Sequence, residues 1–417
     1  MRKTYKFRMY PNKDTEKQLF WTLTRSRELY NAALTERRDA YHFHVRQHPN
    51  YYDEPIRKQL AKELTVGYYE QQNALPEIKA ELREEYQEIA AHVLQDVLRR
   101  LDKAFRNFYR RCKNGENPGF PRFQGHNRYD SFTYPDGAGW KFTVAEQGKK
   151  GTLSLTKIGK AKVKLHRPLE GKIKTVTIKR EVDEWYATFS CEVPEPEKLP
   201  VSSEDVGIDL GVSHLATLSN GEMIEHPRSY RKAQKVLEKR QQALSRKKRG
   251  SHRREKARKL VAKTHRKIAR QRQDFQQKAS KKLVTRYQVI VFEDIKTINL
   301  VRKPTPKQDE KTGQYLPNGA SAKGGLNTSI LDAGWGTFVN MCAHKAAWAG
   351  RTLIKVNPRF TSQLCSGCGH VRNKDLSERW HSCECGTELD RDVNAAINIL
   401  ERGRRQQGAI SVEAPCL

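Results

Sequence analysis

The spacing of apolar residues changes along the first half of the chain, and each change predicts a different kind of structure. Residues 1–10 alternate polar and apolar side chains, which predicts a strand. Residues 14–34 and 77–112 repeat apolar side chains at helical spacing, and Asp14 is a candidate cap for the first of these helices. Residues 119–200 alternate at period two between turns rich in Gly and Pro. This segment predicts a small antiparallel sheet or barrel, which the first strand can join.

The second half predicts a mixed α/β domain that follows a linker at 194–204. The expected elements, in chain order, are two strands joined by an Asn220-Gly221 turn within 205–225, two basic helices within 231–286 that meet near Gly250, a buried strand at 287–295, a helix at 329–349, a strand at 351–357 and a last helix at 392–402. Residues 301–328 contain Pro, Gly and Lys without a period, which predicts a mobile loop or lid.

Charge narrows the classes of function. The 417 residues include 79 Lys and Arg against 48 Asp and Glu, a net charge of +31. Such a charge repels itself in a compact fold, so we expect a polyanionic partner. No apolar run approaches the ~18 residues of a membrane span, and the basic N-terminus lacks the apolar core of a secretory signal. Hydrophobic residues make up 36%, which is enough for folded cores and argues against general disorder.

Three carboxylates stand out in the second half. Asp209 and Glu293 lie near the carboxyl ends of expected strands, and Asp392 begins the last helix. Each alone has an ordinary explanation: Asp209 as a strand-end carboxylate, Asp392 as a helix cap, and Asp294 as a competitor for the role of Glu293. Together they are suited to bind Mg²⁺, and two such ions can hydrolyse a phosphodiester. The order strand Asp, hairpin, strand Glu and helix Asp resembles the RNase-H-type RuvC nuclease fold.

Half of the eight cysteines fall within one short segment. Cys365 and Cys368 form a C-x-x-C pair, and Cys383 and Cys385 form a C-x-C pair. Four thiolates at this spacing suit one structural Zn²⁺, although the second pair is one residue shorter than usual. His370 or His381 therefore remains an alternative ligand, and reduced thiols without metal remain possible. This distribution favours a reducing cytoplasm over a secreted disulfide scaffold.

Several longer motifs resemble the TnpB family, RNA-guided nucleases of IS200/IS605-type transposons that are similar in turn to type V CRISPR effectors. The motifs of the first half are FRMYPN at 7–12, LYNAAL at 29–34, FRNFYRR at 105–111 and NPGFPRF at 117–123. Those of the second half are GIDLG at 207–211, VFEDI at 291–295, DAGWG at 332–336, KAAWAGR at 345–351, CSGC at 365–368 and DRDVNAAINI at 390–399. The resemblance therefore spans essentially the whole chain.

The resemblance implies a multidomain α+β architecture. A wedge-type β-barrel is expected at 1–10 and 119–200, with a helical recognition lobe at 11–118 inserted in it. A RuvC nuclease domain is expected at 201–360 and 388–417, with a zinc-binding insertion at 361–387. The resemblance also implies that Asp209, Glu293 and Asp392 are catalytic, that Asp390 is the lesser candidate, and that the four cysteines bind zinc.

The implied activity is RNA-guided cleavage of DNA beside a short transposon-adjacent motif. The expected cofactors are two Mg²⁺, one Zn²⁺ and a guide RNA from the transposon end. The expected partner is double-stranded target DNA, bound by a monomer in the prokaryotic cytoplasm in association with the nucleoid. Aromatic residues at 108, 109, 129 and 134 are candidates for base stacking, although a place in the core is the favoured prediction for each. The candidate nucleic-acid contacts are Gln95, Thr133, Arg246, Lys247, Lys248, Arg249, Arg253, Arg254, Arg266, Lys267 and Arg270.

Three other classes remain as alternatives. The first is a catalytically weak RNA-guided DNA-binding protein, although all three acids are present. The second is a DNA-joining transposase, for which His42 and His44 offer a His-x-His pair without a partnering motif. The third is a compact type V CRISPR-associated effector, which shares the nuclease chemistry.

Overall fold

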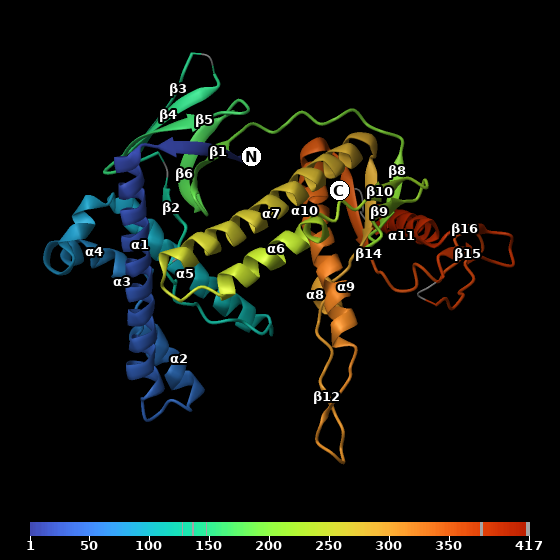
Figure 1. Cartoon of the computed structure of the whole chain (residues 1–417), viewed down its shortest axis with the longest axis horizontal. Helices are drawn as coiled ribbons and strands as arrows, with labels where there is room; N and C mark the ends of the chain where they lie inside the picture. The colour runs from blue at the N-terminus through green and yellow to red at the C-terminus, as the bar shows by residue number, and fades with distance from the viewer. Residues whose placement is uncertain (127, 136, 147, 376–377, 414–417) are drawn as a thin grey trace. The chain divides into compact units, whose positions relative to one another are not determined.

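The computed structural model describes residues 1–126, 128–135, 137–146, 148–375 and 378–413. Contacts divide the chain into two compact units, Met1–Pro194 and Glu195–Leu417, which are treated separately below (Figure 1). Within the described ranges, no helix has the length and apolar character needed to cross a membrane. The finer division into four domains stays a prediction, and its residues 414–417 lie outside the described ranges.

The first unit contains a seven-stranded antiparallel sheet. Its strands are β1 (Arg2–Pro11), β2 (Ser131–Tyr134), β3 (Trp140–Val144), β4 (Lys150–Leu155), β5 (Gly159–Lys164), β6 (Lys172–Glu181) and β7 (Glu184–Glu192). They follow the order β2-β6-β7-β1-β5-β4-β3, with the first strand of the chain at the centre. The alternation predicted a small antiparallel sheet or barrel, and the sheet curls as a half-barrel whose edge strands, β2 and β3, do not pair.

The helices of this unit are α1 (Lys13–Ala40), α2 (Glu54–Glu63), α3 (Tyr68–Asn73), α4 (Leu75–Glu77) and α5 (Ala91–Lys113). Asn12 caps α1 by accepting a hydrogen bond from the Thr15 amide at 2.7 Å, so the expectation for Asp14 was wrong. The helix expected over 77–112 is interrupted at 78–90 by a π turn and a 3₁₀ turn. Tyr86 and Ile89 are both buried there, because the break turns both side chains inward.

The second unit contains a five-stranded mixed sheet. Its strands are β8 (Asp205–Asp209), β9 (His214–Leu218), β10 (Met223–Glu225), β11 (Val289–Glu293) and β14 (Thr352–Val356), in the order β10-β9-β8-β11-β14. β11 runs parallel to both β8 and β14, whereas β9 is antiparallel to β8 and β10. The segment expected to hold two strands holds three, and the Asn220-Gly221 turn joins the second to the third.

Helices cover both faces of this sheet. They are α6 (Ser229–Ser245), α7 (His252–Arg286), α8 (Thr297–Leu300), α9 (Ala320–Ala333), α10 (Trp335–Ala349) and α11 (Arg391–Glu413). Ile290 and Phe292 of β11 pack in the core that includes α7 and α10, whereas Val289 and Val291 pack against α11. Because alternate residues of a strand face opposite sides, β11 separates these two cores.

The segment 301–328 is more ordered than its composition predicts. β12 (Lys307–Gln308) and β13 (Tyr315–Leu316) pair as a short hairpin that projects from the ends of α8 and α9 (Figure 1). The last part of the segment, from Ala320 onward, already belongs to α9. Gly334, at a φ of +65°, then separates α9 from α10, so the single helix expected at 329–349 is two.

Candidate active site and thiol cluster

The three predicted carboxylates meet at one end of the mixed sheet. Asp209 ends β8 and Glu293 ends β11, one residue beyond the registered pair Ile208 and Phe292. Both alternate with side chains that face α7 and α10, so both face α11. Asp392 lies in the first turn of α11, which packs on β8. Parallel strands and a helix start therefore bring together residues that are up to 183 positions apart.

The surroundings raise the pKa of all three acids. Burial raises the pKa of Asp209 to about 8, and the charges of Glu293 and Asp392 contribute to the rise. Burial also raises the pKa of Glu293, against the hydrogen bond from Thr361 and the charge of Arg402. Burial and then Asp390 raise the pKa of Asp392. A set of neighbouring carboxylates in which Glu293 is buried and Asp209 and Asp392 are half-buried is an arrangement that a divalent cation relieves.

The structure distinguishes each acid from its neighbour. Asp390 Oδ1 accepts hydrogen bonds from the amides of Asp392 and Val393 at 2.8 and 3.3 Å, so Asp390 caps α11 and the carboxylate of Asp392 remains available. Asp294 is exposed, whereas Glu293 is 9% exposed. In the described part of the chain, no ion pair involves Asp209, Glu293 or Asp392.

The four predicted thiols form a compact cluster. β15 (Trp380–Ser382) and β16 (Glu388–Asp390) pair around Cys383 and Cys385. Among the described residues, the four cysteines are the one group of three or more metal-ligating side chains whose ligand atoms all lie within 4.8 Å. The carboxylates are therefore more widely spaced than the thiols. His42 and His44 belong to no such group in the described ranges, which removes support for the His-x-His alternative.

The sulfur distances suit tetrahedral zinc. Cys365 and Cys385 Sγ are 3.7 Å apart, and Cys368 and Cys383 Sγ are 3.6 Å apart. Four thiolates around zinc at ~2.3 Å would lie about 3.8 Å from one another. The short C-x-C pair thus reaches the cluster without a substitute ligand. His381 is fully buried beside it, with Nδ1 hydrogen-bonded to Lys374.

One thiol of the cluster is set to ionise. Burial opposes ionisation of Cys365, but the amides of Cys368 and Gly367 and the side chain of His381 outweigh it and lower the pKa of Cys365 to about 5. Thr387 lowers the pKa of Cys385 as well, with its Oγ1 3.1 Å from Cys385 Sγ. Because the thiolate is the metal ligand, these contacts favour metal binding.

Sequence reasoning missed three polar residues that support these two sites. Thr361 donates a hydrogen bond from its hydroxyl to Oε1 of Glu293. Asn394 and Asn398 lie one turn apart on α11, and both are buried. Two asparagines at i and i+4 on an otherwise apolar helical face were the signal for the latter pair, because buried amides require partners. Thr361 carried no comparable signal.

The predicted basic contacts lie on α6, α7 and their connecting turn. Arg246, Lys247, Lys248 and Arg249 form the exposed turn, and Arg253, Lys267 and Arg270 are exposed on α7. Arg254 differs, since its Nη1 donates to the carbonyls of Leu244 and Lys247 at 2.9 Å and so holds the turn. Arg266 is half-buried.

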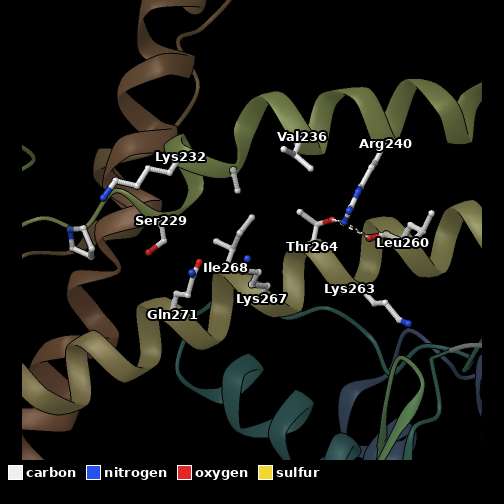
Figure 2. Close-up of a pocket in the computed structure, with 12 residues that line it drawn as sticks. Ser229, Lys232, Val236, Arg240, Leu260, Lys263, Thr264, Lys267, Ile268 and Gln271 are labelled. Carbon is white, nitrogen blue, oxygen red and sulfur yellow. Dashed lines mark hydrogen bonds between the residues drawn. The ribbon is translucent and has the colours of Figure 1, made fainter.

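A groove of about 650 Å³ lies between α6 and α7. Figure 2 shows Arg240 reaching from α6 toward Thr264 and the Leu260 carbonyl of α7, with Lys232, Lys263 and Lys267 around the opening. None of the twelve described lining residues is acidic. The groove therefore combines four cationic side chains with apolar ones.

The candidate contacts in the first unit are less accessible. Thr133 is half-buried, and its hydroxyl contacts Arg100 Nη2 at 2.7 Å and Thr177 Oγ1 at 2.9 Å. Gln95 is half-buried on α5. Tyr129 and Tyr134 are 8% and 1% exposed and so belong to the core, which the sequence favoured over base stacking, whereas Tyr109 is 60% exposed.

Fold and site together define a class: an α+β protein with a strongly basic second unit, a cluster of acids at one sheet edge and a zinc-compatible four-cysteine knuckle. Family models agree with this class. A model described as "Probable transposase" matches residues 188–303, one described as "Cas12f1-like, TNB domain" matches 335–399, and one described as "Helix-turn-helix domain" matches 1–44.

Curated relatives extend the match to the whole chain. A protein of Streptomyces pristinaespiralis, named "Putative RNA-guided DNA endonuclease", is 33% identical over 97% of this chain and 90% of its own. A protein of Escherichia coli (strain K12), named "Putative RNA-guided DNA endonuclease InsQ", is 33% identical over 74% of each chain. The chain belongs to the TnpB family.

A solved structure shares the fold. The "mini-RNA-guided endonuclease CRISPR-Cas_phi3" superimposes with a TM-score of 0.51 over 97% of this chain and 92% of that one, at 9% identity. At that identity the likeness describes the α+β architecture alone.

Proposed function

We propose that this protein is an RNA-guided DNA endonuclease whose RuvC-type site lies in the second unit. The observation that carries the proposal is the convergence of Asp209, Glu293 and Asp392 at one sheet edge, without ion-pair partners, in a chain of net charge +31. The strand order of the mixed sheet, with the second of its five strands antiparallel, agrees with the RNase-H-type arrangement. The two matching relatives carry the same activity in their names.

The donor set fits hard divalent cations. Carboxylate oxygens are the ligands that Mg²⁺ prefers, and the three acids have no ion-pair partner among the described residues. Asp209, Glu293 and Asp392 would hold two such ions. When bound, the ions would supply an activated water and stabilise the leaving oxygen of a phosphodiester. The chain's own residues hold the carboxylates in place: Asp390 caps the helix that carries Asp392, and Thr361 orients Glu293.

The thiol cluster is proposed to hold one structural Zn²⁺. Four sulfurs within 4.8 Å of one another leave no position for a substrate, which is typical of closed structural sites. The cluster would thus stabilise the segment 361–387 rather than take part in chemistry.

Guide RNA and target DNA are the proposed partners of the basic surfaces. The exposed turn at 246–250 and the groove between α6 and α7 suit phosphate backbones, and the affinity should fall steeply as salt rises. Base pairing would read the target, whereas protein would read the adjacent motif, with Gln95 and Thr133 as candidates. The segment 301–328, which follows the Glu293 strand in the chain and carries the β12–β13 hairpin, is proposed to gate the cleavage site as a lid.

A pair of neighbouring acids tests the catalytic assignment. Glu293→Gln removes one buried ligand charge, whereas Asp294→Asn makes the same change at an exposed position. With copurified RNA as guide and Mg²⁺ present, we expect Glu293→Gln to slow cleavage at least about a hundredfold, and Asp294→Asn to leave it within about twofold. Cleavage by Glu293→Gln at the parental rate would refute the proposal.

Sequencing the RNA that copurifies with the chain tests the guide. A single defined species supports guided recognition. A random population of RNA would indicate that the basic surfaces bind RNA nonspecifically.

A further inference from the structure

The segment from Asn357 to Ser366 connects β14 to the thiol cluster and touches the carboxylate site on the way. Thr361, at its centre, is 2% exposed. Its hydroxyl donates to Oε1 of Glu293 and also lies 3.1 Å from the Pro358 carbonyl. In the described part of the chain, Glu293 has no other side-chain partner. Thr361 is therefore the residue that fixes how this carboxylate points.

The same segment is fastened to α11 by two buried asparagines. Asn394 donates to the Leu364 carbonyl at 2.7 Å and accepts from the Ser366 amide at 2.9 Å. Both peptide groups that flank Cys365 are thus bound by one side chain. Asn398 donates to the carbonyls of Thr361 and Leu364 at 2.9 and 2.7 Å. A buried amide without partners costs about 1–3 kcal/mol, so these bonds strongly favour one register between segment and helix.

These contacts form a continuous chain of bonded groups. Cys365 is 1% exposed and belongs to the thiol cluster, and its neighbours are held by Asn394. Asn394 lies two positions after Asp392 on the same helix. Thr361, held by Asn398, bonds Glu293. Two of the three carboxylates are thus mechanically connected to the thiol cluster.

We propose that Thr361, Asn394 and Asn398 are positioning residues, through which the four-cysteine cluster sets the geometry of Glu293 and Asp392 for divalent metal. The inference rests on the proposed function and deepens it. An ordinary structural role, in which these bonds only close the core, would lower thermal stability without changing metal affinity in the folded protein. The two roles therefore differ in one measurable quantity, the affinity of the carboxylate site for a divalent ion.

The test measures Mn²⁺ binding by electron paramagnetic resonance on the full chain with its copurified RNA. Thr361→Val removes the hydroxyl and keeps the shape, whereas Thr361→Ser keeps the hydroxyl. Thr352→Val is the matched control, because Thr352 is exposed at the opposite end of β14. We expect Thr361→Val to weaken Mn²⁺ binding about tenfold, as the loss of one hydrogen bond to a charged group predicts, and Thr361→Ser to restore it.

A second set of variants separates folding from positioning. Thr361→Ala leaves space instead of a methyl group, and it replaces Thr361→Val if thermal unfolding shows that the valine variant does not fold. Cys368→Ser tests the connection itself, and loss of zinc should weaken Mn²⁺ binding at the carboxylates as well. Mn²⁺ affinity within about twofold of the parent in the folded Thr361 variants, or in zinc-free Cys368→Ser, would overturn the inference.

The test of the proposed nuclease function is independent of the test of the positioning residues. Glu293→Gln that still cleaves would remove the nuclease assignment, whatever the Thr361 variants do. Glu293→Gln that is inactive, together with Thr361→Val that binds Mn²⁺ normally, would remove only the positioning role.

Discussion

Gly207, two residues before Asp209, is where the sheet and α11 approach most closely. A Cβ at this position would lie 2.1 Å from the carbonyl oxygen of Ala396 and 2.6 Å from the amide nitrogen of Leu400. Both atoms belong to the backbone of α11, so no side-chain rotation can relieve the overlap. Gly207→Ala must therefore move either the helix that carries Asp392 or the strand that carries Asp209.

The size of the effect follows from these distances. Ordinary contact begins near 3.4 Å, so α11 must retreat by about 1.3 Å from its position at 2.1 Å. Inserting a methyl group into a packed core costs about 1–3 kcal/mol, and we take the upper value because the obstacle is backbone. For a unit of this length, Glu195–Leu417, about 3 kcal/mol corresponds to a fall in Tm of about 6–12 °C.

The assay compares two identical substitutions. Gly325 lies within α9, is exposed and has no atom within 4 Å of its would-be Cβ. Gly325→Ala should therefore raise Tm by about 2–4 °C, because alanine favours a helix over glycine by up to about 1 kcal/mol. Thermal unfolding of the full chain by circular dichroism gives both values, and guided cleavage should fall in Gly207→Ala alone. If Gly207→Ala melts within about 2 °C of the parent, the close approach is not tight and the reasoning fails.

Two further predictions concern protons and thiols. Since burial, with Glu293 and Asp392, raises the pKa of Asp209 to about 8, the folded chain holds this proton more tightly than the unfolded chain. The metal-free protein should therefore lose stability as pH rises from about 4 to about 8, with a contribution from Asp209 of up to ~1.4 kcal/mol per pH unit, and Asp209→Asn should make that slope shallower in denaturant titrations; parallel curves would contradict it. Cys368→Ser should lose zinc by elemental analysis and lower Tm, whereas Cys112→Ser, at an exposed position on α5, should change neither; equal zinc content in both would exclude the site.

The periodic elements could be predicted from sequence because local pattern determines them. The period-two run at 119–200 and the basic helices at 231–286 appear as strands and as α6 and α7. The local pattern could not predict whether the sheet closes into a barrel or where a helix is interrupted. The half-barrel stays open although its two edge strands, β2 and β3, follow each other in the sequence. The break at 78–90 depends on burying Tyr86 and Ile89 together, which is a tertiary requirement.

The candidate site residues could be predicted where their chemistry is unusual for the surrounding sequence. Buried acids in a basic chain and four clustered cysteines are conspicuous without a structure. The residues that support the two sites are not conspicuous in the sequence, because threonine is common in loops and strands. Thr361 becomes notable only when its hydroxyl is seen beside Glu293. For Tyr129 and Tyr134 the sequence allowed both base stacking and core packing, and their burial shows that they belong to the core.

The structure gives a physical role to most residues of the motif at 390–399, which lies at the start of α11. Asp390 caps the helix, which leaves Asp392 to face the sheet edge. Ala395 and Ala396 are fully buried, and their small side chains permit the approach to Gly207. Asn394 and Asn398 use the same face to hold the segment that leads to the thiol cluster. One helix thus combines close packing, a proposed metal ligand and the fastening of the thiol cluster, so a substitution that shifts the helix should disturb all three.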